Sequence, residues 1–127
     1  MAQHYVKATL SSAQMSASFT TAKNIVAAQG ADMVIWPEKI RVKYIAASGS
    51  AIVGGNATTL KVGSATVFTQ DFNGLTATTF YERPNAVTTA VASGMANAAL
   101  SIQTATADPT FYGKVEVEIW YDVVTLS

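Results

Sequence analysis

The clearest alternation of apolar and polar residues lies near the end of the chain, over residues 115–124. Apolar side chains take the odd positions Val115, Val117, Ile119, Tyr121 and Val123. Acidic side chains take the even positions Glu116, Glu118 and Asp122. A period of two in β-branched and aromatic residues indicates a strand with one buried face. We therefore predict a half-buried strand here.

A second alternating stretch covers residues 39–46. Its apolar positions are Ile40, Val42, Tyr44 and Ala46, and its polar positions are the bases Lys39, Arg41 and Lys43. If the two strands pair, this row of bases faces Glu116 and Glu118, which would help to fix the register. We expect the two strands in one sheet, adjacent or nearly so.

The first third of the chain shows shorter patterns. Residues 4–10 alternate as a strand, and Ser11 with Gln14 three positions later predicts a single helical turn with a capping box. Residues 19–28 have an extended character, and residues 33–36 form a short apolar strand. Because Pro37 cannot donate to a ladder, that strand must bend or end there, and we expect it to turn a corner between two sheets.

Further short strands are predicted over residues 59–62, 65–68 and 97–104, with a turn at residues 71–74. The ambiguous residues 75–94 are expected to form one or two short helical turns, interrupted at Pro84. About eight short strands without a helix of ordinary length favour an all-β fold. We predict an antiparallel β-sandwich or jelly roll that residues 1–127 form as a single domain.

The composition argues against nucleic-acid binding, a membrane span and secretion. Eight acids balance eight bases, charged residues make up 13% of the chain, and cysteine is absent. No basic cluster is left over for nucleic acid. The uncharged residues 84–107 hold too many hydroxyl and amide side chains for a membrane span, and residues 1–7 lack the apolar core of a secretion signal. A surface of hydroxyls and methyls suits a protein that packs against others.

Candidate catalytic and metal-binding groups have simpler explanations. His4 has no acidic cluster beside it and is read as a surface residue of an edge strand. Asp71 to Gly74 with Glu82 resembles a calcium loop, but the glycine stands at the wrong place, so a turn is predicted. Glu116 and Glu118 have a spacing that glycosidases could use, but cross-strand ion pairs explain them more simply. We predict no enzyme, no cofactor and no metal.

Aromatic side chains are the remaining candidates for a binding surface. They are Trp36, Trp120, Tyr81, Phe111 and Tyr112. Trp120 lies on the polar face of the last strand, so we expect it to contact a neighbouring subunit. A glycan-binding module would instead use aromatic residues beside polar groups, for which Tyr81 and the pair Phe111 and Tyr112 are candidates.

The order of turns and strands resembles a group of small structural proteins of tailed bacteriophages, along nearly the whole chain. The similarity rests on a series of segments in chain order. They are the opening Leu10-Ser11-Ser12-Ala13, the turn at residues 25–31 leading into Met33-Val34-Ile35-Trp36-Pro37, the loop Gly54-Gly55-Asn56, Asn97-Ala98-Ala99-Leu100, Ala107-Asp108-Pro109-Thr110, the strand Gly113-Lys114-Val115-Glu116-Val117 and the ending Trp120-Tyr121-Asp122-Val123-Val124. That group typically ends on two tyrosines, one variable residue and paired valines, and Trp120 replaces the first tyrosine here.

The resemblance implies a non-catalytic virion component with a jelly-roll or sandwich fold, made in the host cytoplasm. The expected role is a capsid decoration or cement protein that binds the major capsid protein on the outer surface. It would cap the junctions between capsomers as a small homo-oligomer, with a trimer expected. The alternatives are a neck, baseplate or fibre-attachment protein, and, in another class, a glycan-binding module.

Overall fold

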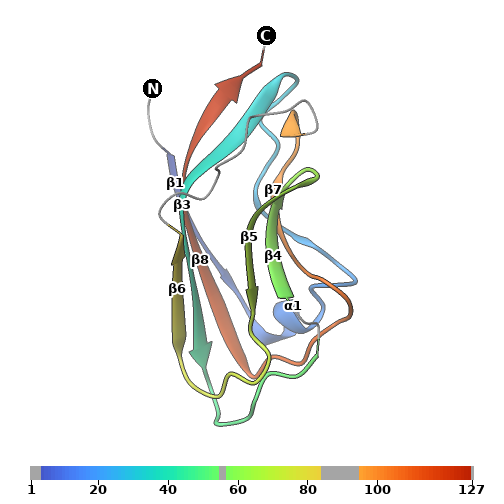
Figure 1. Cartoon of the computed structure of the whole chain (residues 1–127), viewed down its shortest axis with the longest axis vertical. Coiled ribbons are helices and arrows are strands. Elements are labelled where there is room, and N and C mark those ends of the chain that lie inside the picture. The colour runs from blue at the N-terminus through green and yellow to red at the C-terminus, as the bar shows by residue number, and fades with distance from the viewer. Residues whose placement is uncertain (1–3, 55–56, 84–94, 127) are drawn as a thin grey trace.

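The computed structural model describes residues 4–54, 57–83 and 95–126, and it has two four-stranded antiparallel sheets facing each other (Figure 1). The first sheet contains, in spatial order, β1 (His4–Leu10), β8 (Gly113–Thr125), β3 (Met33–Ala46) and β6 (Thr79–Arg83). The second contains β2 (Lys23–Val26), β7 (Leu100–Thr104), β4 (Ala57–Val62) and β5 (Ala65–Asp71). The predicted all-β antiparallel sandwich is confirmed.

The strand pairs are nested along the chain. β1 pairs with β8, β2 with β7, β3 with β6 and β4 with β5, all antiparallel. The ladders β3–β8 and β4–β7 then join these pairs into the two sheets. Nesting of this kind results when one long antiparallel ribbon is rolled up, so strands distant in sequence become neighbours. The start of β1 and the end of β8 consequently lie at the same end of the sandwich (Figure 1).

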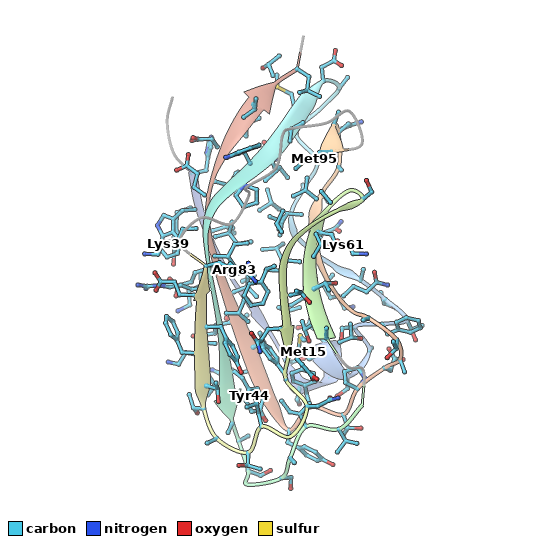
Figure 2. The ribbon with its side chains drawn as sticks, viewed as in Figure 1. Met15, Lys39, Tyr44, Lys61, Arg83 and Met95 are labelled. Atoms are coloured by element: carbon cyan, nitrogen blue, oxygen red, sulfur yellow. The ribbon has the colours of Figure 1, made fainter. Side chains whose placement is uncertain are left out.

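The core fills the space between the sheets. Alternate residues of the central strands are fully buried, among them Val117 and Ile119 of β8, Val42 of β3, Leu60 of β4 and Ile102 of β7. Figure 2 shows Met15 and Tyr44 between the sheets, with Lys39 and Lys61 on opposite outer sides. The period of two in the sequence therefore separates core from surface as predicted.

The central ladder of the first sheet is the predicted pairing of residues 39–46 with the last strand. Its register sets Arg41 opposite Glu118 and Lys43 opposite Glu116. The prediction at Pro37 was only half right. A bulge between Pro37 and Lys39 bends the strand, but β3 stays paired with β8 on both sides of it and does not change sheets. Proline has no backbone N–H to donate to the ladder, and the bulge interrupts the regular pairing at that point. The strand therefore does not need to leave the first sheet.

The helical turn predicted after the first strand is α1 (Ser12–Ser16), and its capping box is present. The backbone amide of Gln14 donates to Ser11 Oγ over 3.2 Å, and the backbone amide of Ser11 donates to Gln14 Oε1 over 2.8 Å. The helix buries Met15 completely at one end of the core.

Two other expectations were wrong in extent or type. Only Lys23–Val26 of the extended stretch 19–28 forms a strand. The helical turns expected within residues 75–94 are replaced over Thr79–Arg83 by β6, an edge strand that pairs with β3. Its β-prone Thr-Phe-Tyr run gains ladder bonds there that one isolated helical turn could not match. The interruption expected at Pro84 lies outside the described residues.

Candidate interface on the outer face of the first sheet

Outward-pointing side chains of β1, β8, β3 and β6 form three rows across the first sheet, which we call the charged face. The first row is Tyr5, Trp120 and Lys39; the middle row is Lys7, Glu118, Arg41 and Glu82; the third row is Thr9, Glu116, Lys43 and Phe80. Seven charged residues, from a chain with eight acids and eight bases, lie in these rows.

The outer face of the second sheet is almost neutral. Its rows are Asn24, Ser101, Lys61 and Thr66, then Gln103, Thr59 and Thr69, and then Ala57 and Asp71. Lys61 and Asp71 are the charged residues of these three rows. The scarce charge of the chain is therefore concentrated on one side of the sandwich, and this asymmetry marks the charged face as the candidate site.

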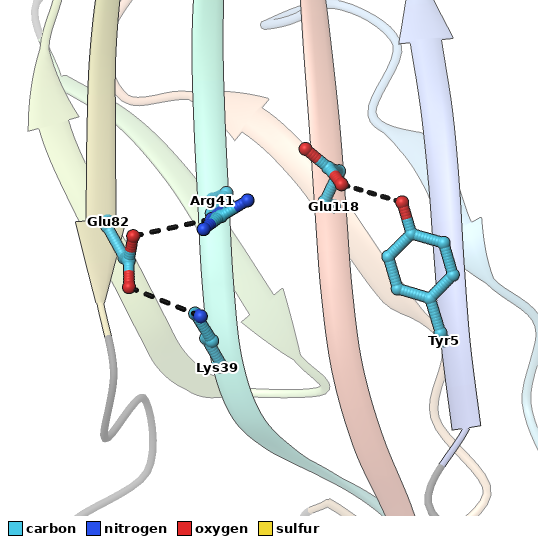
Figure 3. A network of polar contacts seen from close by, with 5 residues as sticks. All are labelled: Tyr5, Lys39, Arg41, Glu82 and Glu118. Carbon is cyan, nitrogen blue, oxygen red and sulfur yellow. Dashed lines mark hydrogen bonds and ion pairs between the residues drawn. The ribbon is translucent and has the colours of Figure 1, made fainter.

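Ion pairs cross the strands of the charged face, but they differ from those predicted. Glu82 accepts both Lys39 Nζ at 3.4 Å and Arg41 Nε at 3.3 Å (Figure 3). Glu116 lies 3.6 Å from Lys7 Nζ on β1. Glu116 and Glu118 were expected to pair with the bases of β3, so this expectation was wrong in its partners. Glu82 on β6, a strand that was not predicted, pairs with Lys39 and Arg41 in place of the two glutamates of β8.

Glu118 is held by a hydroxyl. Tyr5 Oη donates to Glu118 Oε2 over 2.6 Å, from the edge strand to its neighbour (Figure 3). This hydrogen bond raises the pKa of Tyr5, because ionisation would remove the donated proton and set two negative charges together. The Glu118 carboxylate thus has a structural partner.

Trp120 is the aromatic centre of the face and lies half-buried. The Tyr5 ring lies 4.9 Å from it, and two cations lie over it, Lys39 Nζ at 4.9 Å and Arg41 Cζ at 5.4 Å. Arg41 also lies 5.5 Å from the ring of Phe80. Cations over aromatic rings attract electrostatically and hold long side chains in place. The face is consequently a connected layer of aromatic rings and paired charges.

The five aromatic residues selected from the sequence do not meet at one site. Phe111 was wrongly selected as a surface contact, because it is 5% exposed and packs edge-on against Tyr44 in the core. Tyr81 points inward and stacks on Phe72 at 5.4 Å. Trp36 is half-buried in the first part of β3, opposite Asp122. Of the five, Trp120 belongs to the charged face.

Tyr112 lies elsewhere, beside a depression of about 410 Å³ at the end of the sandwich near α1. Its lining includes Thr9, Ser11, Gln14 and Lys114. Hydroxyls, an amide and one ammonium group can donate hydrogen bonds to a ligand, but this lining contains no carboxylate or imidazole for acid–base chemistry.

Sequence reasoning missed Tyr5 and Phe80 as site residues. They are 51% and 50% exposed, and they are among the most exposed large apolar side chains in the described part of the chain. Tyr5 was placed correctly on the first strand, yet its nearness to Trp120 depends on a register between the first and the last strand of the chain. Phe80 was hidden in a segment predicted as helical.

The groups considered for other chemistry have structural roles. The His4 ring stacks on Tyr121 at 5.1 Å on the edge strand. The turn predicted at residues 71–74 is confirmed: the amide of Asn73 donates to Asp71 Oδ1 over 2.9 Å, and Gly74 has a φ of 85°. Within residues 4–54, 57–83 and 95–126, no three His, Cys, Asp or Glu side chains come together as metal ligands.

Comparison with known proteins gives little further guidance. No family model matches the chain, and no curated protein matches it. A solved structure titled "Structure of infectious bursal disease virus Gx strain" is 16% identical, with a TM-score of 0.29. The match covers 98% of this chain and 30% of that one. A likeness at this level carries no argument about function. Among the described residues, no helix has the length and apolar character to cross a membrane.

Proposed function

We propose that the protein is a non-enzymatic structural component of a virion, a capsid decoration or cement protein of jelly-roll type. The observation that carries this proposal is the nested strand order, with β1 on β8, β2 on β7, β3 on β6 and β4 on β5. Nested double-sheet sandwiches of eight strands are the jelly rolls that recur in viral capsid proteins, although lectins and cupins also use them.

The surface supports a binding role more than a catalytic one. The carboxylates of the charged face have structural partners: Glu82 binds Lys39 and Arg41, Glu116 binds Lys7, and Glu118 accepts from Tyr5. The charge-poor rows of the second sheet, rich in hydroxyl and amide side chains, offer many weak contacts with little charge to desolvate. A protein that covers junctions between capsomers needs extended contact surfaces of this kind, and the major capsid protein is the proposed partner.

A glycan-binding role is less well supported by the aromatic geometry. Sugar rings stack on exposed aromatic faces, whereas Trp120 is half-buried and carries Lys39 and Arg41 over its ring. Two further candidates for a sugar groove, Tyr81 and Phe111, pack against Phe72 in the interior, while the third, Tyr112, lies apart from Trp120 at the depression near α1.

The copy number per virion tests the proposal. Quantitative mass spectrometry of purified particles should find on the order of hundreds of copies for a decoration protein, against about a dozen for a neck or baseplate protein, because capsid and tail differ in symmetry. Particles that lack the protein should also release their genome at a lower temperature. Absence of the chain from purified particles would refute a virion role, and a count near a dozen would favour the tail alternative.

A further inference from the structure

The charged face has a sign order that makes it complementary to itself. Across the middle row the charges run positive, negative, positive, negative, from Lys7 on β1 through Glu118 and Arg41 to Glu82 on β6. Reversing such a row end to end inverts every sign. Consider a two-fold axis that lies in the plane of contact, parallel to the strands and midway between β8 and β3. A second copy generated by this axis would face the first copy with its middle row reversed.

From this register we infer that the charged face binds the same face of a second copy, forming a two-fold symmetric dimer. In the middle row, Lys7 then meets Glu82 of the second copy, and Glu118 meets Arg41 of the second copy. Every contact of this row joins opposite charges. Because the contact is isologous, each of these pairs occurs twice.

The neighbouring rows obey the same operation. In the third row, Glu116 lies over Lys43 of the second copy, and Thr9 lies over Phe80 of the second copy. In the first row, Trp120 lies over Lys39 of the second copy, an arrangement that preserves a cation–aromatic contact. Phe80, half exposed in the single chain, becomes covered by Thr9 of the second copy.

Other arrangements fit less well. A two-fold axis perpendicular to the strands would set each strand over its own copy, so Lys7 would meet Lys7 of the second copy and Arg41 would meet Arg41 of the second copy. A three-fold ring joins two different surfaces and makes no use of a self-complementary face. The face therefore favours a dimer over the trimer expected from the sequence.

The area available sets the strength of the contact. Four strands about 4.8 Å apart and about eight residues long, at about 3.3 Å per residue, cover roughly 500 Å² on each copy. The total of about 1,000 Å² lies near the low end for specific interfaces. We therefore expect a dimer that dissociates on dilution. This inference does not depend on the proposed virion role.

Charge reversal on two strands tests the dimer. Sedimentation of the full chain over a concentration series should show a mass rising from 13.3 kDa to twice that value. Arg41→Glu and Glu118→Arg should each raise the dissociation constant about tenfold or more, because like charges then meet across the interface.

Mixing the two variants separates association from folding. In a mixed dimer the two introduced charges are opposite and face each other, and the unchanged Glu118 of one chain faces the unchanged Arg41 of the other. An equimolar mixture should therefore recover dimers. A variant that had merely lost its fold could not be rescued by another.

Lys61→Glu, a charge reversal on the outer face of the second sheet, is the matched control and should leave the dimer unchanged. A wild-type monomer at all concentrations, a trimeric mass, or variants that stay monomeric when mixed would each overturn the inference.

Discussion

At the scale of single residues, Asp108 is a heavily bonded carboxylate outside the charged face. Oδ2 accepts from Thr20 Oγ1 at 2.5 Å, while Oδ1 accepts the backbone amides of Thr20 at 2.8 Å and Phe19 at 3.0 Å. These bonds favour the ionised form, so they lower the pKa of Asp108, with the Thr20 hydroxyl the largest cause. The carboxylate thereby ties the loop before β8 to the loop before β2.

A pH dependence follows from this lowered pKa. A carboxyl group whose pKa is lower in the folded state stabilises the fold above its unfolded pKa of about 3.9, and this stabilisation is lost as the pH falls through the folded pKa. Wild-type melting temperature should therefore drop between about pH 5 and pH 2, and Asp108→Asn should show a smaller drop. Thr20→Val removes the main donor and should reduce the drop in the same direction. Equal drops in all three proteins would contradict this role.

At the scale of elements, β8 carries the core on one face and the proposed interface on the other. Ile119 is fully buried and pairs with Val6 and Ile40 on its two neighbours, whereas Trp120 points outward beside it. Truncation of Ile119 should therefore affect folding stability, whereas truncation of Trp120 should affect self-association.

Ile119→Ala should lower the free energy of unfolding by about 2 to 5 kcal/mol, because it leaves a cavity between the sheets. That loss is a large part of the total stability of a small domain. Trp120→Ala, measured by chemical denaturation of the dilute monomer, should cost much less and should instead weaken self-association. If Trp120→Ala unfolded the monomer and Ile119→Ala had no effect, the two faces of β8 would have to be exchanged.

Local patterns predicted the elements whose causes are local. The first strand, the capping box at Ser11 and the pairing of residues 39–46 with the last strand follow from alternation and capping chemistry within a few residues. The chain failed to turn a corner at Pro37 because a bulge against β8 was sufficient, and β6 formed because β3 offered an unpaired edge. Both outcomes depend on partners distant in sequence, which periodicity within one segment cannot reveal.

The candidate site was likewise predicted only where local alternation was sufficient. Trp120 was assigned to the polar face of its strand from alternation alone. The ion pairs were assigned to the wrong partners, because Glu82 stands beside Lys39 and Arg41 only once β6 joins the sheet. Phe111 follows a turn signal in the sequence, but the loop folds inward and seats its ring against Tyr44 and Phe72.

At the scale of the whole molecule, the net charge is zero, but the charge is segregated. One outer face carries seven charged residues in three rows, whereas three rows of the other carry two, Lys61 and Asp71. Long-range repulsion between copies is therefore weak, and in the proposed dimer short-range pairing on the charged face sets how the two molecules meet.

This distribution predicts the response of self-association to salt. Raising sodium chloride from about 0.1 M to about 1 M shortens the Debye length from about 10 Å to about 3 Å, so contacts between exposed charges weaken. The dissociation constant of the wild-type dimer, measured by sedimentation, should rise severalfold over this range. A chain carrying both Arg41→Glu and Glu118→Arg restores opposite charges across the two-fold axis and should keep the same salt response. Apolar association is not screened in this way, so a dimer that tightened with salt would be held by a surface other than the charged face.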